Sequence, residues 1–150
     1  MEREVHYCTS ADGTRIGYTV FGQGPALIQC PALWVSMDNP YPWMAEPHSQ
    51  LHSGRTVVQY DLRGVGLSQR EVSDFTLDRM IEDIEAVAAA AGLDRFALYG
   101  SQISASPAVL LAVHHPRQVT RLLLTRPFFK GSDLMSPETL DGMVALIQSN

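Results

Sequence analysis

Short apolar runs alternate with helix-patterned segments along this chain, and this alternation restricts the fold more than any other feature of the sequence. The runs are four to eight residues long and rich in β-branched or aromatic residues, which is typical of strands. Two of them flank the turn-forming cluster Ala11-Asp12-Gly13 and are expected to form an antiparallel hairpin. The expected strands are Val5–Thr9, Thr14–Phe21, Ala26–Gln29, Thr56–Tyr60, Phe96–Tyr99 and the buried-type run Val119–Thr125. Strands separated by helices predict an α/β fold with a mostly parallel sheet.

The clearest expected helix follows Thr76, which is a residue type favoured at the N-cap. Apolar residues then recur every three or four positions from Leu77 to Ala91, while Glu82, Asp83 and Glu85 are expected mostly on the opposite face. Gly92 follows as the expected stop. Further helices are expected over 103–114, after Ser136-Pro137, and, as a short helix after Pro47, within a long proline-rich loop over 31–54.

Composition places this chain among ordinary soluble domains. Its 150 residues fit one domain, with 45% hydrophobic and 18% charged residues. The net charge of −5 and the lack of a basic stripe argue against nucleic-acid binding. No apolar run approaches the length of a membrane span, and the start MEREVHY does not resemble a signal peptide. Two cysteines are too few for a disulfide framework, so we expect a cytoplasmic protein.

The turn after the strand Phe96–Tyr99 has glutamine where a known sequence pattern has serine. After the strand ending at Tyr99, the sequence Gly100-Ser101-Gln102-Ile103-Ser104 leads into a helix. In G-x-S-x-G, this strand–turn–helix position presents a nucleophilic serine. Here Gln102 occupies the serine position and Ser104 the closing glycine position. A carboxamide is a poor nucleophile, and an adjacent base cannot activate it as it would activate serine.

The chain resembles the N-terminal part of the α/β-hydrolase fold family. The most specific match is the turn DLRGVGLS over 61–68, followed in the expected order by AGLDRFALYG and HHPRQVTRLLL. The opening VHYCTSADGTRIGYTVFGQGP, the stretch CPALW and the closing SPETLDGMVALIQSN look like the hydrolase-like domain found with bacterial adenylate/guanylate cyclases and helix-turn-helix regulators. The resemblance covers essentially the whole chain. It implies one truncated hydrolase-like domain over 1–150, without the C-terminal strands of the full fold.

Compared with that family, the sequence has three deficits for hydrolysis. Gln102 replaces the nucleophile, and Cys30-Pro31 stands where many relatives carry His-Gly, although the amide of Ala32 or Leu33 could still serve as an oxyanion donor. The family's acid and histidine are expected beyond Asp141, where this chain offers neither. The resemblance places a ligand pocket at the carboxyl ends of the strands. Its expected lining is Cys30, Ala32, Leu33, Trp34, Ser101, Gln102 and Ile103.

Other polar residues have a functional and a structural interpretation. Ser101 or Ser104 could be a displaced nucleophile, but serines at a helix start are more often caps. His48 and His52 have the i, i+4 spacing of a metal pair, yet a surface or loop role is favoured because a third ligand is missing. We expect no metal and no cofactor.

The remaining candidates have alternatives of the same kind. His114 and His115 end a helix, where they suit the helix dipole, and Asp61 and Arg63 are expected to hold their turn together. Cys30 could be reactive, but a lone buried-type cysteine is usually inert.

These observations favour a non-catalytic module for ligand sensing or protein interaction, with a regulatory role and a small apolar ligand. The alternative is an esterase-like hydrolase whose missing catalytic residues come from a partner chain or a longer parent protein. A third interpretation is a structural remnant that only oligomerises. The run Val119–Thr125 would lie at a sheet edge, where unpaired apolar strands tend to associate, so we expect a homodimer.

Overall fold

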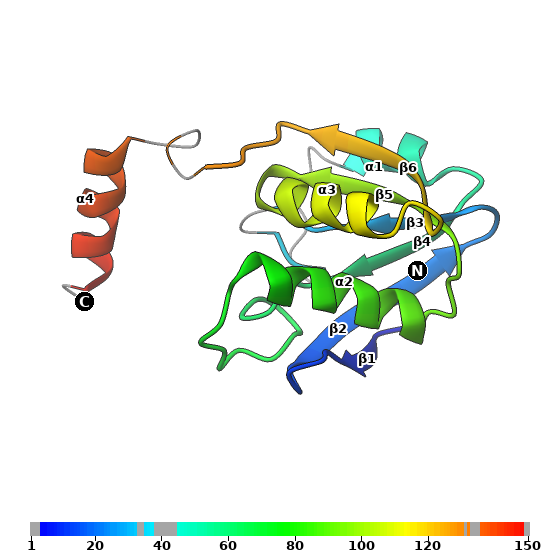
Figure 1. The fold of residues 1–150 in the computed structure, drawn as a ribbon, viewed down its shortest axis with the longest axis horizontal. Helices are drawn as coiled ribbons and strands as arrows, with labels where there is room; N and C mark the ends of the chain where they lie inside the picture. Colours follow the sequence, from blue (N-terminus) through cyan, green and yellow to red (C-terminus); the bar gives the residue numbers. More distant parts are fainter. Residues whose placement is uncertain (1–3, 33–34, 38–44, 131, 133–135, 149–150) are drawn as a thin grey trace.

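A computed structural model of the chain describes residues 4–32, 35–37, 45–130, 132 and 136–148. Within these residues, six strands form one mixed sheet in the order β1-β2-β4-β3-β5-β6 (Figure 1). The strands are β1 (His6–Thr9), β2 (Arg15–Gly22), β3 (Ala26–Gln29), β4 (Thr56–Tyr60), β5 (Phe96–Ser101) and β6 (Val119–Thr125). The helices are α1 (Ala45–His52), α2 (Leu77–Ala90), the short 3₁₀ helix η2 (Gln102–Ser104), α3 (Ala105–His114) and α4 (Pro137–Gln148).

The strand directions confirm the predicted α/β class. β1 and β2 form the expected antiparallel hairpin, and β2 also runs antiparallel to β4. From β4 onward the neighbours β4-β3, β3-β5 and β5-β6 are all parallel. Parallel neighbours place the carboxyl ends of these strands at one edge of the sheet, where the turn after β5 lies.

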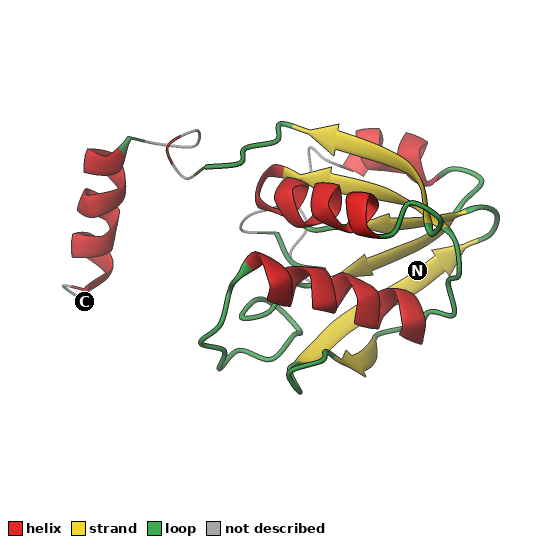
Figure 2. Cartoon of the chain, in the orientation of Figure 1, coloured by secondary structure: helices red, strands yellow, loops and turns green. Residues whose placement is uncertain are grey.

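Helices cover both faces of the sheet (Figure 2). Ile28 and Leu98 belong to the larger core, which also contains the buried residues of α2 and α3. Leu27 and Ala97, one position earlier on the same strands, form a smaller cluster with Leu51 of α1 on the other face. This alternation follows from the two-residue period of a strand. Among the described helices, none is long and apolar enough to cross a membrane.

The predicted amphipathic helix is present as α2, and its end has the expected glycine. Gly92 has φ +67°, and two hydrogen bonds of a Schellman motif close the helix, from Gly92 N to Ala89 O and from Leu93 N to Ala88 O. At the other end, Thr76 is the N-cap residue, as predicted, although its side chain makes no capping bond. Its hydroxyl donates to the Asp74 carboxylate instead.

One prediction needs correction. The expected helix over 103–114 begins as η2 and becomes α-helical only at Ala105, because β5 continues to Ser101. The run Val119–Thr125 forms β6 with the predicted bounds and, among the described strands, lies at the sheet edge where the sequence placed it. There Leu122, Leu123 and Leu124 are 36%, 37% and 38% exposed.

Helix α4 confirms the expected start after Ser136. The Ser136 hydroxyl accepts a hydrogen bond from Thr139 N at 3.3 Å, as an N-cap does, and Pro137 is the first helical residue. In Figure 1 this helix stands apart from the sheet, and its described side chains are exposed.

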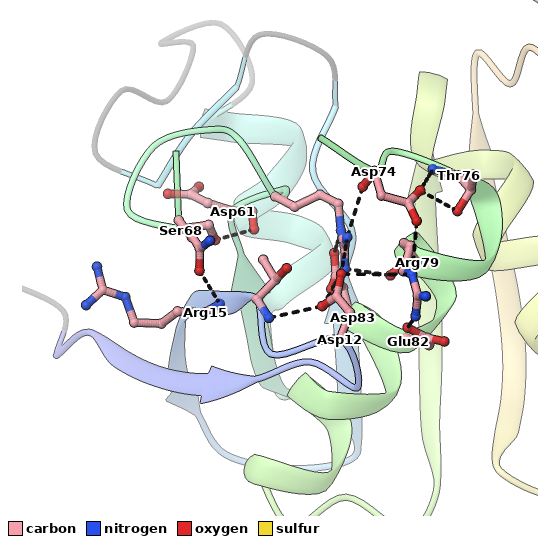
Figure 3. Close-up of polar contacts among 12 residues, drawn as sticks. Asp12, Arg15, Asp61, Ser68, Asp74, Thr76, Arg79, Glu82 and Asp83 are labelled. Atoms are coloured by element: carbon pink, nitrogen blue, oxygen red, sulfur yellow. Dashed lines mark hydrogen bonds and ion pairs between the residues drawn. The ribbon is translucent and has the colours of Figure 1, made fainter. Parts of the chain in front are cut away.

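A buried arginine joins three segments that lie far apart in the sequence. Arg63, whose side chain is fully buried, follows β4 and donates two bonds to the Asp83 carboxylate of α2, at 2.8 and 2.7 Å. It also donates to the Asp12 carboxylate in the β1–β2 turn, at 2.8 Å (Figure 3). The carbonyl oxygens of Asp74 and Arg79 accept further bonds. These partners raise the pKa of Arg63 and lower the pKa of Asp12.

This network corrects the expectation for Asp83. Its position on α2 predicted a solvent-facing carboxylate, but the residue is only 1% exposed because it pairs with Arg63. A charged group can be buried in this way only when a partner of opposite charge and good geometry compensates the loss of water.

Asp61 stabilises the same turn through backbone groups. Its carboxylate accepts bonds from Leu67 N at 2.8 Å and from Met37 N at 2.7 Å, which links the turn to the segment after β3. The Ser68 hydroxyl donates to the Asp61 carbonyl and accepts a bond from Gly17 N of β2. Asp61 and Arg63 therefore have the turn-stabilising role that the sequence favoured.

Replacing Arg63 tests how much the fold depends on this network. Arg63→Met leaves Asp83 buried without its partner, so we expect the free energy of unfolding to fall by about 3–5 kcal/mol. Urea denaturation followed by circular dichroism measures the loss. Arg79→Met is the matched control, because that side chain forms its ion pairs at the surface. Equal losses in the two variants would contradict the assigned role of Arg63.

Candidate functional site

The turn between β5 and α3 has an unusual backbone conformation at one residue. Ser101 is extended, with φ −127°, whereas Gln102 has φ +52°. A positive φ is uncommon in residues other than glycine and often marks a functional turn. The chain therefore reverses sharply at Gln102, the position that the G-x-S-x-G pattern assigns to the nucleophile.

Gly100 permits the close approach of α3 that this turn requires. A Cβ atom added to Gly100 would lie 2.9 Å from Ala108 Cβ and 3.1 Å from Ala105 Cα. Both neighbours belong to the first turn of α3, so a larger residue would push the helix away from β5. Steric crowding by α3 therefore explains why glycine occupies the first position of the G-x-S-x-G pattern in this chain.

The two serines beside Gln102 are buried. Ser101 is 4% exposed, and Ser104 is fully buried with its hydroxyl donating to the carbonyl oxygen of Pro31. This bond joins the turn to the segment that follows β3. Sequence reasoning did not find the Pro31–Ser104 contact, because no pattern connects residues 73 positions apart.

The segment after β3 supplies the other predicted pocket residues. Cys30 is 1% exposed, and burial raises the pKa of its thiol to about 12, so the thiol is neutral and packs in the core. Ala32, Gln102 and Ile103 are partly exposed. Leu33 and Trp34, also predicted to line the pocket, lie outside the described residues. Ligand binding by these residues stays a prediction.

His115 lies at the other end of β5. Its ring is 2.9 Å from the Glu85 carboxylate of α2, and the two residues line a cavity of about 270 Å³ together with Phe96. Phe96 and Ser101 are the two ends of β5, so this cavity is separated from the Gln102 turn by roughly 16 Å along the strand. His114 is exposed. Neither histidine is placed to serve the turn.

His48 and His52 contact the sheet instead of forming part of a metal cluster. The Gln29 side chain of β3 contacts both rings: His52 Nε2 is 2.5 Å from its carboxamide oxygen, and its carboxamide nitrogen is 3.4 Å from His48 Nδ1. The two rings stack at 5.7 Å. In the described part of the chain, no three His, Cys, Asp or Glu residues are grouped so that they could hold a metal ion. The i, i+4 spacing identified the pair, but not its partner Gln29.

Burial lowers the pKa of His48 below its usual value of 6.5, and this predicts a pH dependence. Below that value the unfolded chain binds a proton at His48 that the folded chain resists, so the stability falls as the pH decreases. Between about pH 7.5 and pH 5.5 we expect the urea midpoint to fall, and less so in His48→Gln. His114→Gln, at an exposed position, is the control. An unchanged pH dependence in His48→Gln would contradict this assignment.

Comparisons with known proteins support the fold that the geometry indicates. A soluble epoxide hydrolase of Corynebacterium sp. (strain C12) is 27% identical over 122 residues, which are 79% of this chain and 40% of that protein. An esterase from Exiguobacterium antarcticum superposes on 98% of the chain with a TM-score of 0.80 and 18% identity, and a hydrolase from Pseudomonas aeruginosa PA01 does so with a TM-score of 0.79 and 20% identity.

The chain is shorter than these proteins. It spans 40% of the epoxide hydrolase and 57% and 54% of the two solved chains. The family model for the alpha/beta hydrolase fold matches residues 25–148, which include the Asp61 turn, the Gln102 turn and every helix described above. This chain belongs to the alpha/beta hydrolase fold family.

Proposed function

We propose that this chain is a non-catalytic member of the family that binds a small apolar ligand beside the Gln102 turn. The observation that carries the proposal is Gln102 itself, held at φ +52° in the position of the nucleophile. Its carboxamide has no proton that a base could remove to make a nucleophile. The same group can donate and accept hydrogen bonds, which suits it to recognise a polar atom of a bound ligand.

The neighbouring serines do not replace the missing nucleophile. Ser104 donates its hydroxyl to the Pro31 carbonyl, and attack by Ser104 would require breaking that buried bond. Ser101 is almost fully buried at the end of β5. A nucleophile must reach its substrate and contact a base, and these two environments favour a structural role for both hydroxyls.

The segment after β3 also suits binding better than acyl transfer. Pro31 has no backbone N–H to donate to an oxyanion, and its carbonyl oxygen accepts the Ser104 bond. Carbonyl oxygens are repelled by the negative charge that develops in acyl transfer. An apolar ligand carrying one neutral polar group develops no negative charge, so the Pro31 carbonyl oxygen does not repel it.

The resemblance to the domain that accompanies bacterial cyclases and helix-turn-helix regulators supports a regulatory use of such binding. A ligand-binding domain in a cytoplasmic regulator changes the activity of an attached or associated protein when the ligand favours one conformation. On this proposal the hydrolase fold serves as a binding scaffold.

The alternative is an esterase-like hydrolase completed by residues from a partner chain or a longer parent protein. The epoxide hydrolase, at 27% identity, favours this alternative. It predicts that one of the described hydroxyls becomes reactive, and labelling experiments distinguish the two functions.

Activity measurements test the non-catalytic assignment. With p-nitrophenyl butyrate and a fluorophosphonate probe, we expect neither turnover nor covalent labelling of the chain. Gln102→Ser supplies a hydroxyl but no activating base, so we expect it to remain inactive. Labelling of the unchanged chain that disappears in Ser101→Ala or Ser104→Ala would overturn the proposal.

Binding measurements test the ligand site. We expect p-nitrophenyl butyrate to raise the thermal midpoint of the chain, and Gln102→Ala to weaken this effect by about tenfold in apparent affinity, the loss of roughly one hydrogen bond. Gln118→Ala is the matched control, because Gln118 contacts the opposite end of β5 through Phe96 N. Equal binding by both variants would exclude Gln102 from the site.

A further inference from the structure

The cavity between α2 and α3 lies at the end of β5 farthest from the Gln102 turn. The two helices lie next to each other on one face of the sheet (Figure 1). The buried side chains of Ala88, Phe96 and Leu111 form the floor of the cavity. Its volume of about 270 Å³ is somewhat below the roughly 300–1,000 Å³ of drug-sized ligand pockets. The cavity therefore suits a compact ligand with an apolar part.

The polar part of this lining is acidic. Glu85 of α2 and Asp94, which precedes β5, place two carboxylates at the rim, and His115 and Gln118 are the other polar residues of the described lining. That lining contains no lysine or arginine. His115 Nε2 lies 2.9 Å from one oxygen of the Glu85 carboxylate. Because a carboxylate has a second oxygen, Glu85 can accept a further hydrogen bond from a ligand.

The two helices add partial charge of the same sign. Ala88 and Ala89 belong to the last turn of α2, which ends at Ala90, and Leu111 belongs to the last turn of α3, which ends at His114. The C-terminal end of a helix carries a partial negative charge that acts over its last turn. Both helix ends and both carboxylates therefore favour a cation in this cavity.

We propose that the cavity between α2 and α3 is a second ligand site, which binds a small organic cation. The ligand is a primary ammonium ion with a short aromatic or aliphatic tail. Its three N–H donors suit the carboxylates of Glu85 and Asp94 at the rim. The tail packs against Phe96 and Leu111 in the floor, where it leaves water. A carboxylate ligand of the same shape would meet two like charges, so the site selects by charge.

This site is separate from the one proposed at the Gln102 turn. Phe96 and Ser101 are the two ends of β5, roughly 16 Å apart along the strand. The residues predicted to line the Gln102 pocket are absent from the described lining of the cavity. We therefore expect Gln102→Ala to bind the cation as well as the unchanged chain does. Loss of cation binding in Gln102→Ala would overturn the assignment to the cavity.

Nuclear magnetic resonance titration tests the site and its selectivity. The probe is phenethylammonium chloride, compared with phenethyl alcohol and sodium phenylacetate, which have the same ring and a different charge. At pH 7.5 and low salt, we expect phenethylammonium to shift the backbone amides of residues 85–94 and 115–118. We expect its affinity to exceed that of the alcohol by about fivefold, and phenylacetate not to bind. Equal affinities for the three probes, or shifts confined to residues 101–104, would overturn the proposal.

A charge variant tests the role of the rim. Glu85→Gln removes the negative charge but keeps the shape of the side chain, so we expect phenethylammonium to bind about fivefold more weakly. Glu82→Gln is the matched control, because Glu82 lies on the same helix, pairs with Arg79 and is not part of the described lining. Equal affinities in the two variants would exclude Glu85 from the site.

A filled cavity tests where the tail binds. Ala89→Leu adds a larger side chain at an exposed position of the lining, and leucine is a good helix former, so we expect the fold to persist and binding to weaken by about tenfold or more. Ala90→Leu is the control, because Ala90 is the next exposed residue of α2 and lies outside the described lining. Unchanged binding in Ala89→Leu, with an unchanged circular dichroism spectrum, would overturn the proposal.

Discussion

The buried charge of Arg63 is the interaction on which the rest of the fold depends. Its guanidinium connects the hairpin turn at Asp12, helix α2 at Asp83 and two backbone carbonyls, and these partners come from segments up to 71 residues apart. A single arginine thereby fixes how α2 lies against the sheet. The neighbouring Asp61 joins the same turn to the segment after β3. The polar turn after β4 therefore positions both the helical layer and the loop beside the candidate site.

The Gln102 turn keeps the backbone geometry of the G-x-S-x-G pattern although glutamine replaces the usual serine. Close packing of Gly100 on α3 and the Ser104–Pro31 bond hold the backbone, and neither interaction involves the side chain of Gln102. Gln102 adopts its positive φ between these two contacts.

Much of the fold could be predicted from local patterns. The apolar period of α2 and the stop at Gly92 were recovered, and β3, β4 and β6 have the predicted bounds. The prediction failed where a residue depends on a distant partner. Asp83 was expected in solvent, but it is buried against Arg63, 20 residues earlier in the chain. This tertiary contact replaced the arrangement that the helix pattern alone favours.

By itself, the sequence determined the strands and helices, the sharp turn at Gln102 and the absence of a nucleophilic atom from that side chain. These features depend on residues close together in the chain, and so local spacing is sufficient to predict them. Only the tertiary structure decided that Arg63 joins Asp12 to Asp83, that Ser104 binds Pro31, and that the β6 leucines are exposed. Burial and pairing depend on neighbours brought together by folding, and an apolar strand does not specify whether anything covers it.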